Sequence, residues 1–167
     1  MLEIKAKLKI AKSAYRLEVK GRLRLPFALR KGGHAQAKLE SGEEVALRLP
    51  RGEVLRGGDL VTASDGRVIE VIAALEPLLH VVCASAAQLA RAAWQLGSEH
   101  VPAEIGAGFL RVAAERALAE KLRQSGATVS EVEAPFEPEI EAGVPHDHGH
   151  DHGHGHGDHD HDHDHKH

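Results

Sequence analysis

The sequence predicts an α+β protein with three parts: a small all-β N-terminal domain over residues 1–75, a second domain of strands and helices over 76–138, and a disordered tail over 139–167. Three observations predict this division. Hydrophobic and polar residues alternate as far as Ile72, which is typical of half-buried strands. After Pro77, strand-like runs are interleaved with helical spacing, and after Glu139 the regular hydrophobic spacing ends.

The first domain is predicted from runs in which every second residue is apolar. These runs are Ile4, Ala6, Leu8 and Ile10, then Leu17, Val19, Leu23 and Leu25, then Val45, Leu47 and Leu49. Residues two apart in a strand point to the same face, so each run supplies one buried face. Ser41-Gly42 and Asp65-Gly66 are turn sequences between such runs.

The second domain begins with a strand over residues 78–84 and a helix. Ser85 and Gln88 match a capping box, in which both side chains satisfy free amides at the start of a helix. Gly97 is expected to end this helix in a left-handed conformation. The apolar helix face is expected to comprise Leu89, Ala90, Ala93 and Trp94. Trp94 should therefore lie in the core or in a dimer contact.

Two short strands, a second helix and a last strand follow. The strands are expected over 103–105 and 109–112, Gly126 should end the helix, and the last strand should cover 128–132. The inward-facing residues of the second helix are expected to be Ala114, Leu118 and Leu122. The order strand, helix, strand, strand, helix, strand is the βαββαβ arrangement of ferredoxin-like domains.

Composition narrows the class of protein. Cys83 is the single cysteine, so no intramolecular disulfide can form, and a reducing cytoplasm is the expected location. No apolar run reaches the roughly 18 residues of a membrane span, so a membrane protein is not expected. A formal net charge of -4 favours no nucleic-acid partner, because such partners are bound through clustered Lys and Arg.

The tail is predicted to bind metal. Eleven of the 14 histidines lie there, and they are His146, His148, His150, His152, His154, His156, His159, His161, His163, His165 and His167. In an extended chain, residues two apart lie roughly 6.5 Å from each other, so two imidazoles can reach one ion. Neutral imidazole suits Ni(II), Zn(II) and Cu(II). A solvated low-complexity tail or an affinity tag is the alternative explanation.

Several stretches resemble the urease accessory protein UreE family. Residues 95–102, Gln-Leu-Gly-Ser-Glu-His-Val-Pro, are similar to its Leu-Gly-Asn-Arg-His-Val-Pro motif. Similarity also covers Ser41-Gly42-Glu43-Glu44-Val45 with Leu49-Pro50-Arg51-Gly52, Asp65-Gly66-Arg67-Val68 with Ala73-Ala74-Leu75-Glu76-Pro77, and Ala134-Pro135-Phe136-Glu137-Pro138. In this chain Ser98-Glu99 replaces the Asn-Arg that precedes the family's histidine.

The resemblance implies a nickel metallochaperone without enzymatic activity. It would deliver Ni(II) to apo-urease beside other urease accessory proteins and would dimerise through its C-terminal domain. His100 aligns with the family's metal-binding histidine, which meets its twin across the dimer axis. Storage or detoxification of nickel or zinc through the tail is the alternative. A metal-dependent hydrolase is disfavoured because the sequence lacks His-Glu-x-x-His or a comparable cluster.

Three other residues are expected to have ordinary structural roles. His34 follows Gly32-Gly33 in a predicted loop, and His80 lies within an apolar strand. Cys83 is expected to pack as a small hydrophobe.

Overall fold

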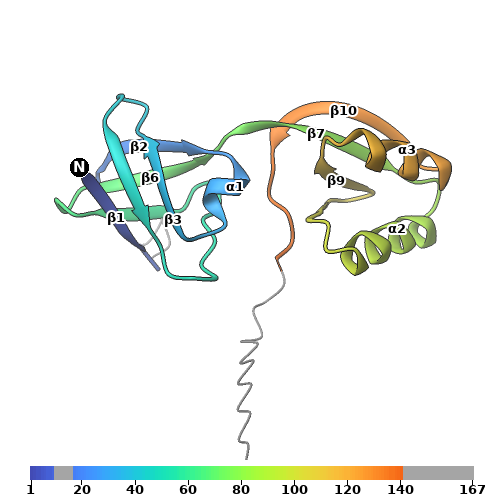
Figure 1. Ribbon diagram of the computed structural model, residues 1–167, viewed down its shortest axis with the longest axis horizontal. Coiled ribbons are helices and arrows are strands. Elements are labelled where there is room, and N and C mark those ends of the chain that lie inside the picture. The colour runs from blue at the N-terminus through green and yellow to red at the C-terminus, as the bar shows by residue number, and fades with distance from the viewer. Residues whose placement is uncertain (10–16, 141–167) are drawn as a thin grey trace, which may run out of the picture.

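The computed structural model describes residues 1–9 and 17–140, which form two lobes (Figure 1). Ile10 of the first predicted strand and the histidine tail lie outside the described residues. The N-terminal lobe contains β1 (Leu2–Lys7), β2 (Val19–Leu25), α1 (Phe27–Arg30), β3 (His34–Lys38), β4 (Glu44–Arg48), β5 (Leu60–Ala63) and β6 (Val68–Ala73). The C-terminal lobe contains β7 (Leu75–Val82), α2 (Ala86–Ser98), β8 (Glu104–Ile105), β9 (Phe109–Ala113), α3 (Arg116–Gln124) and β10 (Thr128–Pro135).

The N-terminal lobe is one six-stranded sheet in the order β2-β6-β5-β1-β4-β3. The β1–β4 and β2–β6 pairs are parallel and the other pairs are antiparallel. The predicted alternation is confirmed in the buried core, which includes Ile4, Leu23, Leu25, Val45, Leu47, Ile69 and Val71. The four-residue helix α1 is an addition to the predicted all-β region.

Four described residues of the predicted alternating runs do not belong to this core, and they are Ala6, Leu8, Leu17 and Val19. Leu8 and Val19 are half-buried. Ala6 is exposed, because the register between β1 and β5 shifts between Ile4 and Ala6 and breaks the alternation. Leu17 is also exposed and precedes β2.

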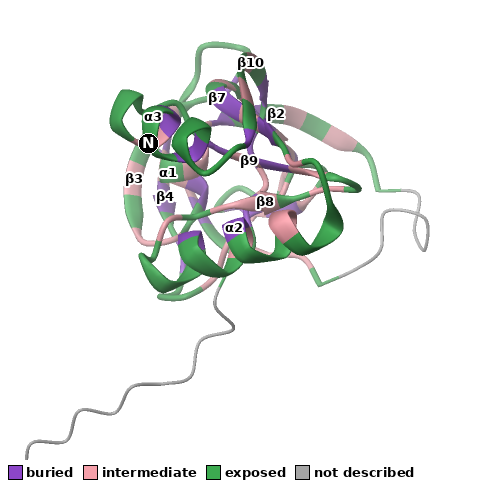
Figure 2. Ribbon diagram, turned by 90° about the vertical axis from the view of Figure 1, so that its right-hand side faces the viewer, coloured by how far each residue is buried: buried purple, intermediate pink, exposed green. Residues whose placement is uncertain are grey.

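The C-terminal lobe has the predicted order of elements. Its sheet has the strand order β10-β7-β9-β8, and all neighbouring strands are antiparallel. Both helices contribute to a single core on one face of this sheet, as Figures 1 and 2 show. The buried side chains of that core are Leu79, Val81, Ala92, Leu96, Leu110, Val112, Ala119, Leu122 and Ala127.

Helix α2 begins as predicted, but its buried face differs from the prediction. The Ser85 hydroxyl accepts a hydrogen bond from the Gln88 amide at 3.2 Å, and the Gln88 side chain accepts one from the Ala84 amide at 2.9 Å. The face that packs on the sheet is Leu89, Ala92, Ala93 and Leu96. The expectation for Ala90 was wrong, and Trp94, which is 76% exposed, is not in the core. The side of α2 that packs on the sheet is the one that carries Leu96, and Trp94 is not on that side.

Helix α3 starts later than the sequence suggested. Ala114 is exposed and precedes the helix, so its predicted inward position was wrong, whereas Leu118 and Leu122 do face the core. Gly126 has a φ of 90° just after the helix, which confirms its predicted role. None of the helices formed by the described residues has the length and apolar character that crossing a bilayer would require.

Candidate metal centre

His100 lies immediately after helix α2, in a backbone conformation that usually belongs to glycine. Its φ is 56°, and among the described residues it is the only non-glycine with a positive φ. The His100 amide donates to the Gly97 carbonyl at 3.0 Å, and the Val101 amide donates to the Leu96 carbonyl at 2.9 Å. These two bonds are the Schellman pattern, in which the residue at the position of His100 adopts the left-handed conformation.

This geometry corrects the prediction for Gly97, which is helical and does not end the helix. A left-handed conformation costs an L-residue about 1–2 kcal/mol, and glycine avoids that cost. A residue held in such a conformation supports a functional role for its side chain. The exposed imidazole of His100 is therefore the strongest candidate ligand among the described residues.

His100 lines a cleft of about 620 Å³ between the two lobes. Most of the lining is apolar, and two of its isoleucines, Ile105 and Ile140, are 55% and 41% exposed. The contributors are Phe27, Lys31, Gly52 and Val54 from the N-terminal lobe, Ala93, Gly97, His100, Val101, Pro102, Ala103 and Ile105 from the C-terminal lobe, and Glu139 and Ile140 after β10. No local sequence pattern predicts this cleft, because its walls come from segments far apart in the chain.

The start of the tail lies in the same cleft wall as His100. The Glu139 amide donates to the carbonyl of Ala103, three positions after His100 in the sequence, at 2.9 Å. The eleven tail histidines from His146 onward lie outside the described residues, and no contact between them and His100 is described.

The other histidines and the cysteine lie elsewhere. His34 is the exposed first residue of β3, so its predicted place in a loop was wrong. The His80 ring lies 4.7 Å from the Phe109 ring, and its Nδ1 accepts a hydrogen bond from Arg111 at 3.4 Å. Cys83 packs half-buried against the core, as expected. Within residues 1–9 and 17–140, no three His, Cys, Asp or Glu side chains gather as a metal-binding group.

Glu99, which directly precedes His100, interacts with side chains of its own lobe. Its carboxylate forms an ion pair with Lys121 of α3 and accepts a hydrogen bond from Gln95 at 3.3 Å. The Lys121 hydrogen bond is the main reason why the pKa of Glu99 is lowered. This carboxylate therefore links α2 to α3 beside His100.

Comparisons with known proteins agree with this architecture. The family models described as UreE urease accessory protein, N-terminal domain and C-terminal domain match residues 7–74 and 76–167. The urease accessory protein UreE of Nitrosospira multiformis is 44% identical over 125 residues, which cover 75% of this chain and 71% of the relative. Proteins of the same name from Paraburkholderia xenovorans and Burkholderia vietnamiensis are 49% and 45% identical over 70% and 72% of this chain. The matched regions span 52% and 60% of those two relatives. With two consecutive domain matches and these identities, the chain belongs to the UreE urease accessory protein family.

Proposed function

We propose that this protein is a nickel metallochaperone that delivers Ni(II) to apo-urease during assembly of the urease metal centre. The observation that carries the proposal is the left-handed His100, an exposed imidazole at a position where glycine would be more stable. Family membership supports urease maturation as the process, since the relatives are named urease accessory proteins. The protein binds and transfers the ion and performs no covalent chemistry.

A homodimer completes the site in this proposal. Sites for borderline divalent ions use several protein ligands, and His100 is not part of a larger ligand cluster within the described part of one chain. A second copy supplies a second His100. Exposed apolar side chains on the same lobe, Trp94 and Ile105, support an interface there, because burying apolar area stabilises association.

The tail supplies further imidazoles to the same ion. From Ile140 to His146 there are six residues, and an extended chain of that length spans about 20 Å. The first tail histidines are thus within reach of the cleft that His100 lines. The tail collects Ni(II) at exchangeable sites and passes it to the dimer site. Zn(II) and Cu(II) compete, because imidazole also suits these ions.

The remaining assignments are part of the same proposal. Residues 1–75 form a domain available to partners, residues 76–138 form the metal-binding and dimerisation domain, and residues 139–167 form the metal-binding tail. The partners are apo-urease and the other urease accessory proteins, in the cytoplasm, with no role for nucleic acid or membrane.

Calorimetric titration with Ni(II) tests the proposal. The full chain, a chain ending at Pro145 and His100→Ala are titrated, and light scattering gives the oligomeric state of each. One tight ion per dimer should survive removal of the tail and disappear with His100→Ala. The chain ending at Pro145 should also retain partial activation of apo-urease.

Storage or detoxification is the second candidate function, favoured by the run of eleven tail histidines. In that case all tight binding, together with any effect on apo-urease, would disappear with the tail. His100→Ala would then behave like the parent chain.

A further inference from the structure

Residues 136–140, which we call the strap, follow β10 and run back between the two lobes (Figure 1). Phe136 and Pro138 are buried, whereas Glu139 and Ile140 are exposed in the cleft wall. The strap connects the folded C-terminal lobe to the histidine tail. The contacts of the strap therefore fix the position in the structure from which the tail starts.

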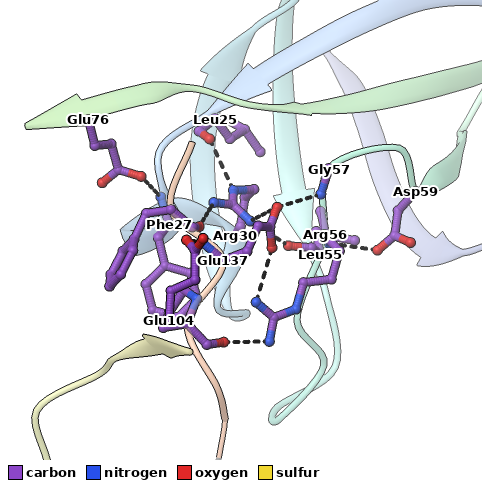
Figure 3. Close-up of polar contacts among 12 residues, drawn as sticks. Leu25, Phe27, Arg30, Leu55, Arg56, Gly57, Asp59, Glu76, Glu104 and Glu137 are labelled. Carbon is purple, nitrogen blue, oxygen red and sulfur yellow. Dashed lines mark hydrogen bonds and ion pairs between the residues drawn. The ribbon is translucent and has the colours of Figure 1, made fainter. Parts of the chain in front are cut away.

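On the N-terminal side, the strap neutralises a buried cation. Arg30 of α1 is 0% exposed, and its guanidinium donates to the Leu25 and Leu55 carbonyls at 3.1 Å each (Figure 3). It also donates to the Glu137 carboxylate at 3.1 Å and to the Phe136 carbonyl. A buried charge is unfavourable unless it is paired and fully hydrogen-bonded, so Arg30 depends on the strap.

Glu137 receives two more donors from the N-terminal lobe. The Gly57 amide donates to it at 2.8 Å, and Arg56 donates to its second oxygen at 3.0 Å. Arg56 also donates to the Pro138 carbonyl at 2.7 Å. Both carboxylate oxygens of Glu137 are therefore held by groups more than 75 residues away in the sequence, as the separations of 80, 81 and 107 residues show.

On the C-terminal side, the strap is held close to His100. The Glu137 amide donates to the Glu104 carboxylate at 3.0 Å, and the Glu139 amide donates to the Ala103 carbonyl at 2.9 Å. On the N-terminal side, Phe136 also packs edge-on against Phe27 of α1, with ring centroids 5.5 Å apart. The strap is thus fixed to both lobes, and it ends in the cleft that His100 lines.

We infer that Glu137 is a positioning residue for metal transfer: held by Arg30 and Arg56, it fixes the root of the tail beside His100 and raises the effective concentration of tail imidazoles there. The inference rests on the proposed function. Release of the strap would lengthen the tether from Ile140 to His146 by the five strap residues, from about six to about eleven. Effective concentration falls roughly as the −3/2 power of tether length, so a loss of about 2.5-fold per tail is expected.

Glu137→Gln is the main test variant, because glutamine keeps the shape and one acceptor but removes the charge that pairs with Arg30. Glu133→Gln is the matched control, since Glu133 is an exposed glutamate four residues earlier on β10. Arg56→Gln is a milder variant that removes contacts to the strap and leaves the buried Arg30–Glu137 pair in place. Circular dichroism verifies that each variant is folded.

The first measurement needs no metal. Trp94 is the single tryptophan and lies on α2, the helix that leads to His100, so it serves as a fluorescence donor. An acceptor dye is attached to Ala142→Cys in a Cys83→Ala background. Energy transfer should fall in Glu137→Gln, and to a smaller degree in Arg56→Gln, and should be unchanged in Glu133→Gln.

The second measurement is Ni(II) affinity with and without the tail. Glu137→Gln should weaken the tight site about 2.5-fold in the full chain and leave it unchanged in the chain that ends at Pro145. Unchanged energy transfer, or an equal affinity loss in both chain lengths, would overturn the inference. If the parent chain binds no Ni(II) at His100, the proposed function fails, while the energy transfer still decides whether Glu137 positions the tail.

Discussion

Replacing His100 with glycine should stabilise the metal-free protein while removing its metal site. A left-handed L-residue costs about 1–2 kcal/mol, and the φ of 56° places His100 in that region. Glycine avoids this strain, but it makes the unfolded chain more flexible, which lowers the stability by roughly 0.5–1 kcal/mol. Because the two capping bonds of His100 and Val101 use backbone atoms only, they persist in the variant. We expect a net gain of about 0.5–1 kcal/mol in the free energy of unfolding.

The assay is thermal and urea unfolding with a chelator present. For a chain of this size, 1 kcal/mol corresponds to about 2–4 °C in Tm, so His100→Gly should melt about 2 °C higher than the parent. His100→Ala is the matched control and should not be stabilised, because its Cβ meets the same backbone strain. If glycine and alanine have equal stabilities, the strain argument for His100 is wrong.

With Ni(II) bound, the parent chain should become more stable than His100→Gly. Ni(II) at 100 times its Kd adds about 2.7 kcal/mol to a protein that binds it only when folded. The parent chain should gain this stabilisation and His100→Gly should not. The parent would then melt above the glycine variant. If His100→Gly gains as much from Ni(II) as the parent, His100 is not a ligand of the tight site.

Three further predictions concern the dimer, the tail and an ion-pair cluster. Trp94→Asp should yield monomers by light scattering with little change in Tm, because the exposed Trp94 side chain is outside the core. Ni(II) binding by the tail should weaken between pH 7 and pH 5 by about 25-fold for each ligating imidazole, since an unperturbed imidazole titrates near pH 6.5 and only its neutral form binds metal. Arg67→Gln should raise the pKa of Glu43, which the Arg67 hydrogen bond lowers, and the stability that it costs at pH 7 should shrink as the pH falls through the folded pKa of Glu43.

Each of these predictions has a contradicting result. Dimers of Trp94→Asp at micromolar concentration would exclude Trp94 from the interface. Equal Ni(II) affinity at pH 7 and pH 5 would mean that the ligands are not histidines. The direction of the pH effect for Arg67 follows from the lowered pKa of Glu43. The ion pair stabilises the fold above the pKa that Glu43 has in the unfolded chain, and this stabilisation is lost as the pH falls through its folded pKa. A stability difference that does not shrink as the pH falls would contradict this cause.

The sequence alone determined features that depend on neighbouring residues. Alternation predicted the strands around Leu23, Val45 and Ile69, because the two faces of a strand differ every second residue. Ser85 and Gln88 predicted the start of α2, since a helix cap is made by residues three positions apart. The order of the C-terminal elements followed from the same local patterns.

The tertiary structure decided what depends on distant segments. Local spacing grouped Trp94 with the apolar residues of α2, but docking on the sheet buried Leu96 and exposed Trp94. From the sequence, Gly97 was expected to end α2. In the structure Leu96 is buried, the helix continues through Gly97 to Ser98, and His100 adopts the left-handed conformation. The pairing of Arg30 with Glu137 joins residues 107 positions apart. No local pattern encodes such a contact, because it forms only when both lobes enclose the same charge.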